Sequence, residues 1–141
     1  MLLTIEKILI LKSVKIFSSV PESQLTDLAT IVETVEFDAG ETIIRRGELG
    51  TSMYIVANGK VRISDGTKEL GILGERTVFG ELAALDPEPR AASVEAVEDC
   101  TLLRLGGESL YDLMSGNKEV TRGIIQVLCE YTRTNLALAT S

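Results

Sequence analysis

The sequence predicts a mainly β fold with flanking helices: an antiparallel β roll of the jelly-roll-like, double-stranded-helix type. Apolar residues recur at three- and four-residue steps before residue 34 and again after residue 106, as in amphipathic helices. Between these regions, short apolar runs alternate with turns rich in Gly, Asn and Asp, which is typical of antiparallel sandwiches and rolls. We therefore expect one domain, residues 1–141, with N-terminal helices (1–33), a β roll (34–106) and C-terminal helices (107–141).

Two short helices are expected before the roll. The first covers residues 4–17, and residues 18–21 break it. The second begins with Pro21, whose fixed φ suits the first position of a helix. Its apolar face has helical spacing and comprises Leu25, Leu28, Ala29 and Val32.

Turn residues divide the β region into short strands. Asn58-Gly59 is the strongest hairpin signal in the chain and is expected to join two paired strands. Asp65-Gly66 predicts a second hairpin of the same kind. The expected strands cover residues 36–37, 42–44, 53–56, 60–63, 68–73, 93–97 and 101–105.

Helical spacing returns after Gly106-Gly107. A short helix contains Leu110 and is expected to end at Gly116. A longer helix follows, and residues 136–139 either extend it or fray. Its apolar stripe comprises Val120, Ile124, Val127, Leu128 and Tyr131.

Composition narrows the classes of function. The chain has 141 residues, 45% of them hydrophobic, and a formal net charge of −7. This charge disfavours binding to nucleic acid or to an anionic membrane surface. No stretch has the character of a signal peptide or a spanning helix, so we expect no membrane insertion and a cytoplasmic location.

Catalytic and metal chemistry are not expected. The chain contains no His, which removes Ser-His-Asp and Cys-His catalysis and His-ligated metals. Cys100 and Cys129 lack CxxC spacing and are expected to be buried thiols in a reducing compartment. We expect no enzyme, no catalytic residue, no metal and no cofactor.

Residues 79–94 have the character of an anion-binding loop. Gly80 allows close approach of the backbone to a ligand. A single helical turn follows, so the amides of Leu82 and Ala83 are expected to be unpaired at its N-terminus. Two prolines end the turn, and Arg90 then offers a charged fork suited to phosphate.

Glu81 is the exception in this loop, because a carboxylate repels phosphate. It is explained if it accepts a hydrogen bond from a hydroxyl of the same ligand. A ligand with a phosphate and a nearby hydroxyl is a nucleotide or a sugar phosphate. The alternative is that Arg90 is a solvated surface charge and Glu81 an acid that favours the helix N-terminus.

Two motifs together resemble the cyclic nucleotide-binding domain family of the catabolite activator protein and the protein kinase A regulatory subunit. The first is residues 43–59, with its glycines and a four-residue apolar strand. The second is residues 79–96, which include a phosphate-binding cassette at 79–92. The order of helices, roll and helices also matches, so the resemblance covers nearly the whole chain.

The resemblance implies roles for residues of the cassette. Arg90 would pair with the cyclic phosphate, helped by the amides of Ala83 and Ala91. Glu81 and the Gly80 backbone would hold the ribose 2′-hydroxyl. The full implied set is Gly80, Glu81, Leu82, Ala83, Arg90, Ala91 and Ala92. Ala84 departs from the family, which usually has a larger aliphatic residue there.

The choice of base follows from the residue after the arginine. A Ser or Thr at this position can hydrogen-bond guanine, whereas Ala91 cannot, so the resemblance favours cAMP over cGMP. Val61 and Ile72 are candidates for the base pocket but are equally plain core residues. Tyr131 is a candidate aromatic lid over the base, or simply a helix-packing residue.

The implied function is a sensor and regulatory module in which ligand binding moves the C-terminal helices. The alternative is a structural or interaction domain that keeps the fold and dimerises through the stripe of Val120, Ile124, Val127 and Tyr131. The output stays open: the chain is a stand-alone binder, a homodimer, or part of a longer regulator, transporter or channel.

Overall fold

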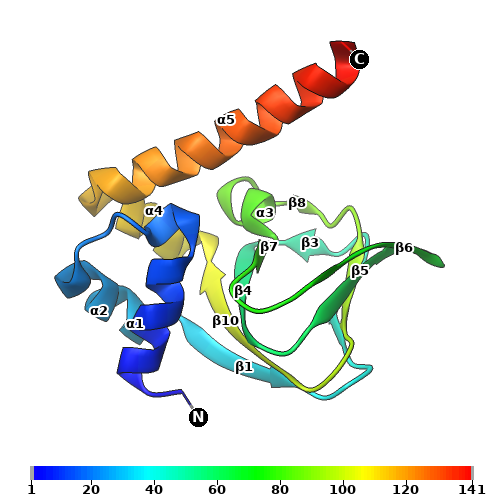
Figure 1. Cartoon of the computed structure of the whole chain (residues 1–141), viewed down its shortest axis with the longest axis horizontal. Coiled ribbons are helices and arrows are strands. Elements are labelled where there is room, and N and C mark those ends of the chain that lie inside the picture. Colours follow the sequence, from blue (N-terminus) through cyan, green and yellow to red (C-terminus); the bar gives the residue numbers. More distant parts are fainter. Residues whose placement is uncertain (1, 141) are drawn as a thin grey trace.

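The expected antiparallel roll is present in the computed structural model, which describes residues 2–140 and the side chains of residues 2–134 (Figure 1). Two four-stranded sheets have the strand orders β1-β10-β4-β7 and β2-β9-β5-β6, and β3 pairs with β8. The strands are β1 (Glu33–Phe37), β2 (Thr42–Ile44), β3 (Leu49–Gly50), β4 (Ser52–Asn58), β5 (Val61–Asp65), β6 (Lys68–Leu73), β7 (Val78–Phe79), β8 (Glu88–Pro89), β9 (Ser93–Ala96) and β10 (Cys100–Gly106).

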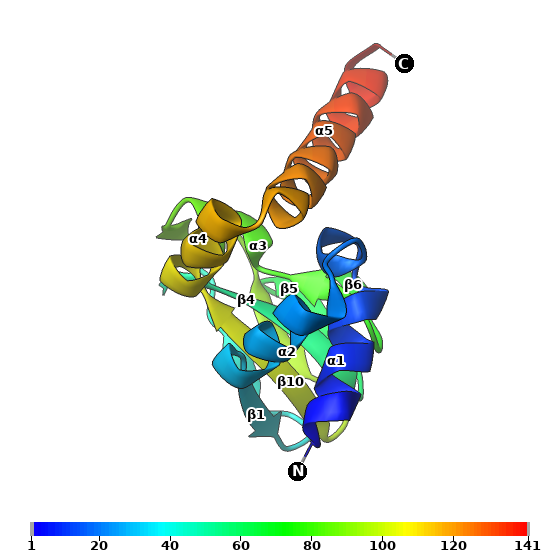
Figure 2. The same ribbon diagram turned by 90° about the vertical axis from the view of Figure 1, so that its left-hand side faces the viewer.

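Helices cover one side of the roll, and one turn of helix lies inside the β region (Figures 1 and 2). They are α1 (Thr4–Ser13), η1 (Lys15–Phe17), α2 (Glu22–Ile31), α3 (Glu81–Leu85), α4 (Gly107–Gly116) and α5 (Lys118–Thr140). Figure 2 shows the C-terminal end of α5 projecting from the body of the domain. The expected C-terminal helix therefore extends through residues 136–139.

The first expected helix is shorter than its apolar spacing predicts. It ends at Ser13 because Val14 is extended, with φ −88° and ψ 132°, and η1 follows. This bend turns Ile16 and Phe17 into the core, where they are 5% and 0% exposed. Pro21 is also one position off, since it caps α2 in an extended conformation rather than opening it.

The expected hairpin at Asn58-Gly59 is wrong. β4 pairs with β10 and β7, whereas β5 pairs with β6 and β9, so the chain crosses from one sheet to the other here. Gly59 has φ 97°, and a Cβ on it would lie 2.6 Å from the Asp99 carbonyl oxygen. Glycine permits this close approach where the chain passes between the sheets. The Asn-Gly pair predicts a turn, but it does not show whether the next strand pairs with the one before it.

The hairpin at Asp65-Gly66 is confirmed by the pairing of β5 with β6.

Two buried clusters hold the fold together. One joins the helices to the outer face of the first sheet and includes Phe17, Leu28 and Leu103. The other lies inside the roll between the sheets and includes Tyr54 and Phe79. The α3 turn contributes Ala84, 1% exposed, to the helical cluster. Phe79, two residues before α3 begins, belongs to the cluster inside the roll, so the cassette lies where both clusters meet.

Gly123 allows η1 to lie directly against α5. A Cβ at Gly123 would be 2.6 Å from the Ile16 carbonyl oxygen. We expect Gly123→Ala to lower the free energy of unfolding by about 1–3 kcal/mol, because the overpacked backbone must shift. Chemical denaturation measures this change. Gly116→Ala is the matched control, since nothing lies within 4 Å of its added Cβ. An equal loss in both variants would contradict the packing argument.

Candidate functional site

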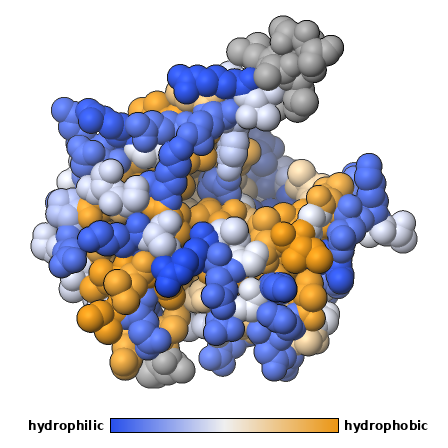
Figure 3. All heavy atoms as spheres, in the orientation of Figure 1, coloured by the Kyte–Doolittle hydropathy of each residue, from blue (hydrophilic) through white to orange (hydrophobic). Residues whose placement is uncertain are grey.

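A cavity of about 800 Å³ lies between the cassette, the inner face of the second sheet and α5. Figure 3 shows the hollow below α5, with apolar side chains exposed in it. Its walls combine the α3 turn and the segment after it with strand residues and two residues of α5. All seven cassette candidates line it: Gly80, Glu81, Leu82, Ala83, Arg90, Ala91 and Ala92.

The α3 turn forms as its sequence predicts. Gly80 precedes it with φ 79°, a left-handed conformation that favours glycine. Ala84 N donates to the Gly80 carbonyl oxygen at 3.3 Å, which closes the turn. The amides of Leu82 and Ala83 come before that bond, so they belong to the unpaired amides of a helix start.

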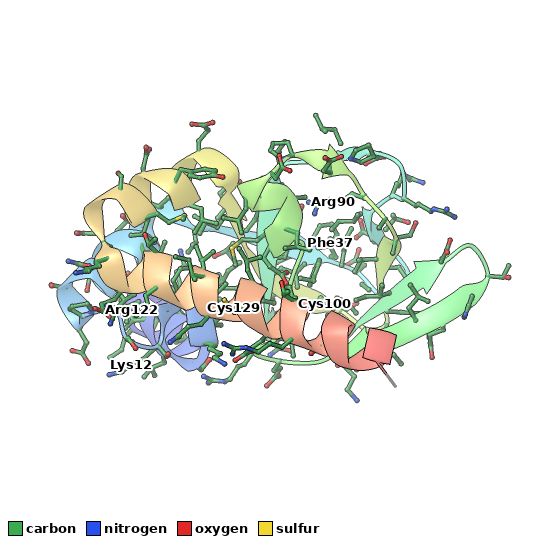
Figure 4. All side chains as sticks on the ribbon, turned by 90° about the horizontal axis from the view of Figure 1, so that it is seen from above. Lys12, Phe37, Arg90, Cys100, Arg122 and Cys129 are labelled. Atoms are coloured by element: carbon green, nitrogen blue, oxygen red, sulfur yellow. The ribbon has the colours of Figure 1, made fainter. Side chains whose placement is uncertain are left out.

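Arg90 is held by backbone carbonyls and not by an acid. Its Nη2 donates to the Ser52 carbonyl oxygen at 2.7 Å and its Nη1 to the Gly80 carbonyl oxygen at 3.4 Å. None of the salt bridges among the described side chains involves Arg90. Partial burial lowers the pKa of Arg90 from its ordinary value, yet an arginine stays charged at every working pH. Figure 4 shows Arg90 beside the cassette helix.

Two glycines make room for the Arg90 side chain. A Cβ on Gly50 would overlap the guanidinium group of Arg90. A Cβ on Gly80 would lie 2.8 Å from Arg90 Nη1 and 3.1 Å from the Ser52 carbonyl oxygen. The sequence interpretation missed Gly50, although it belongs to the glycine-rich motif at residues 43–59. The arginine is therefore enclosed by backbone on both sides.

Tyr131 of α5 reaches the cassette. Its hydroxyl donates a hydrogen bond to Glu81 Oε1, the carboxylate expected to accept a ligand hydroxyl. Burial, and then this hydrogen bond, raise the pKa of Tyr131 above its ordinary value. The phenol consequently stays a neutral donor up to and beyond pH 10. The contact connects the C-terminal helix directly to the cassette.

Two of the three base-pocket candidates need correction. Val61 is 0% exposed inside the core, and Ile72 is 49% exposed and does not line the cavity. Ile63 and Leu73 line it instead. Successive side chains of a strand point to opposite faces of the sheet. Ile72, which pairs with Arg62, therefore faces outward, whereas Leu73 faces the cavity. Tyr131, the third candidate, does line the cavity.

Among the described side chains, the two cysteines and the acidic groups form no second site. Cys100 is buried, as expected, and burial raises the pKa of its thiol; Cys129 is only half-buried. Within residues 2–134 no cluster of acidic, Cys or His side chains could hold a metal ion.

In the described part of the chain no helix has the length and apolar character that crossing a membrane requires.

The family comparison agrees with this geometry. A model described as "Cyclic nucleotide-binding domain" matches residues 34–117. The chain belongs to this family. The match contains the roll from the second residue of β1 onward, together with the cassette, and it stops just after α4.

Relatives of this cyclic nucleotide-binding domain are longer proteins. A CRP-like cAMP-activated global transcriptional regulator of Mycobacterium tuberculosis is 32% identical over 136 residues, 92% of this chain and 61% of the regulator. A putative potassium channel protein of Rhodopseudomonas palustris is 34% identical over 128 residues, 89% of this chain and 31% of the channel. The chain thus spans about three fifths of the first relative and a third of the second.

Solved structures show the same fold. The catabolite activator protein of Thermus thermophilus superposes with a TM-score of 0.79 and 29% identity. The alignment covers 89% of this chain and 62% of that protein. The predicted β roll with flanking helices is therefore confirmed by both the strand pairing and the comparison.

Proposed function

We propose that the domain binds a cyclic nucleotide, cAMP in preference to cGMP, in the cavity beside the cassette, and signals occupancy through α5. One observation carries the proposal: among the described side chains Arg90 has carbonyl partners only, and it lies on a cavity wall next to the first amides of α3. An arginine without an acid partner, beside free amides, is suited to an anionic phosphate.

The charges around the cavity favour a singly charged phosphate. Arg90 is the one cation among its described lining residues, whereas Glu81, Asp86 and Glu88 supply three carboxylates. The whole chain carries a formal charge of −7, which also repels anions. A cyclic phosphodiester with one charge is balanced by Arg90, but the two charges of a 5′-phosphate are not.

The preference for adenine rests on the absence of a hydroxyl group at residue 91 of the cavity wall. Ala91 lines the cavity and has no hydroxyl to offer to guanine. Ile63, Leu73 and Leu128 add apolar surface, which accepts a purine without selecting its polar edge. The discrimination between cAMP and cGMP is accordingly expected to be modest.

A comparison of three nucleotides tests the ligand. We expect cAMP to raise the thermal midpoint most, cGMP less and AMP least, because at equal concentration the ligand with the lower Kd stabilises the folded state more. Equal stabilisation by AMP and cAMP would contradict a site for a cyclic phosphate.

The coupling to α5 follows from a shared acceptor. Glu81 accepts the Tyr131 hydroxyl in this structure and is the proposed acceptor of the ribose hydroxyl. If the two hydroxyls compete, a bound ligand loosens the contact between α5 and the cassette. A ligand shifts a helix between two positions only if it binds the protein more tightly when the helix is in one of them. Competition for Glu81 supplies this difference in affinity.

Replacing Tyr131 with phenylalanine tests the competition. The ring is kept, and the hydrogen bond to Glu81 is lost. We expect cAMP to bind about threefold to tenfold more tightly, because Glu81 no longer has to release Tyr131. Isothermal calorimetry measures the change. Tyr111→Phe on α4 is the control, because it also loses a hydroxyl bond to the cassette helix, at the Leu85 carbonyl oxygen, but none to Glu81. Weaker binding by Tyr131→Phe would contradict competition and favour a lid that donates its hydroxyl in the bound state.

Dimerisation through the C-terminal stripe receives less support. Val120 and Ile124 are 0% and 3% exposed because they pack into the core of their own chain. With α5 in the position that this structure shows, these two residues are therefore not accessible to a partner chain. The relatives are longer than the chain, so we propose that the domain controls a further domain of a regulator or channel.

A further inference from the structure

A row of four side chains crosses the first sheet and ends at the cassette. Glu33 of β1 is paired with Arg104 of β10, Arg104 with Tyr54 of β4, and Tyr54 with Phe79 of β7. Residues directly opposite one another on neighbouring strands have side chains in contact range. Phe79 is followed at once by Gly80, so the row leads from the far edge of the sheet to the Arg90 site.

The first and last links of the row are specific contacts. Arg104 Nη2 lies 2.5 Å from Glu33 Oε2. The rings of Tyr54 and Phe79 are stacked, with centroids 5.1 Å apart and planes 11° from parallel. Both rings are buried, at 8% and 5% exposure. The stack is therefore a fixed part of the roll.

The stack joins the two strands that hold Arg90. The guanidinium donates to the carbonyl oxygens of Ser52 and Gly80. Ser52 lies two residues before Tyr54 on β4, and Gly80 directly follows Phe79 of β7. β4 and β7 pair through only two residue pairs, one of which is Tyr54 with Phe79. Backbone hydrogen bonds of Val56 with Arg76 and Thr77 hold the same segments further along. The stack is the side-chain contact at the end where the two carbonyls lie.

A second cavity adjoins the arginine on the side of Tyr54. It has a volume of about 220 Å³ and is lined by Arg90, Tyr54, Arg104 and Ser52 among others. On this side the guanidinium lacks packing contacts, so its orientation depends on its two carbonyl acceptors. Tyr54 is in the wall of that hollow together with both arginines. Arg104 is paired with Glu33, which leaves Arg90 as the cation for a ligand.

We propose that Tyr54, held in its stack with Phe79, is a positioning residue that orients Arg90 for the phosphate. This inference rests on the proposed function, because it concerns the same arginine. Tyr54 touches no ligand atom in this role. It acts by keeping the Ser52 and Gly80 carbonyls at the separation that points the Arg90 fork into the ligand cavity.

A double-mutant cycle tests the inference. We expect Tyr54→Leu to weaken cAMP binding about tenfold when Arg90 is present, and less than about twofold in an Arg90→Lys background. A lysine is a point charge on a flexible stem and needs no orientation as a fork. Tyr54→Phe keeps the ring and should restore most of the affinity. Phe37→Leu is the matched control, an aromatic replacement in the same sheet four residues from the row.

The outcomes separate the two proposals. An equal loss from Tyr54→Leu in both backgrounds would show a general structural effect and overturn the positioning role. No loss in the Arg90 background would overturn it too. If Arg90→Lys binds cAMP as well as wild type, the orientation of the fork does not matter and the positioning role is overturned. If the wild-type chain does not bind cAMP, the proposed function fails instead. If Tyr54→Leu does not fold, Phe79→Leu breaks the stack from the other strand and enters the same cycle.

Discussion

Arg90→Ala should weaken cAMP binding at least about tenfold, since each hydrogen bond to a charged group contributes roughly 1.5–3 kcal/mol. The free energy of unfolding should change little. Removing Arg90 leaves no acid without its partner. The two carbonyl acceptors belong to residues that line cavities open to water, Gly80 in the ligand cavity and Ser52 in the second cavity. The variant therefore separates binding from stability.

Calorimetric titration with cAMP measures the loss. Arg122→Ala is the control, because it removes the same charge from an exposed position on α5 that does not line the cavity. If both variants lose affinity equally, the long-range charge of the chain and not the site is responsible. Near wild-type affinity for Arg90→Ala would remove Arg90 from the proposed function.

Gly50→Ala should abolish most of the cAMP binding by displacing the Arg90 side chain instead of removing it. The added methyl group would occupy the space of the Arg90 guanidinium, which is the far end of a flexible side chain. The arginine is expected to swing away, so that the chain still folds but its fork no longer faces the phosphate. We expect a loss of affinity of about tenfold or more, comparable with Arg90→Ala. The thermal midpoint without ligand should be nearly unchanged.

Gly74→Ala is the control for this change. It lies in the same β region, and nothing lies within 4 Å of the added Cβ. It should leave both affinity and thermal midpoint unaltered. If Gly50→Ala binds cAMP like wild type, the arginine tolerates the methyl group and the enclosure by Gly50 has no role in binding. If Gly50→Ala adds its loss to that of Arg90→Ala, Gly50 acts independently of the arginine.

Local sequence was sufficient to predict the cassette. Gly80, the helical turn after it and the two prolines each set backbone geometry over a few residues, and the structure shows the α3 turn where they place it. Tyr131 was also a candidate, since its spacing from Ile124 and Val127 places it on one face of α5. The sequence did not show that its hydroxyl meets Glu81, fifty residues away.

Pairing between strands was not predictable in the same way. Asn58-Gly59 has the composition of a hairpin turn, but whether the next strand pairs locally or joins the other sheet depends on the whole roll. The choice between Ile72 and Leu73 likewise depends on register, because one residue of shift exchanges the two faces of a strand.

The amino-acid sequence by itself determined the fold class, the position of the cassette and the identity of its arginine, because turns, helix starts and charge are properties of short segments. Only the tertiary structure decided what surrounds that arginine. Gly50, Ser52 and Tyr54 lie about forty positions before Arg90 in the sequence. The folding of the roll brings them into contact with Arg90. A local sequence pattern cannot predict contacts between residues so far apart in the chain.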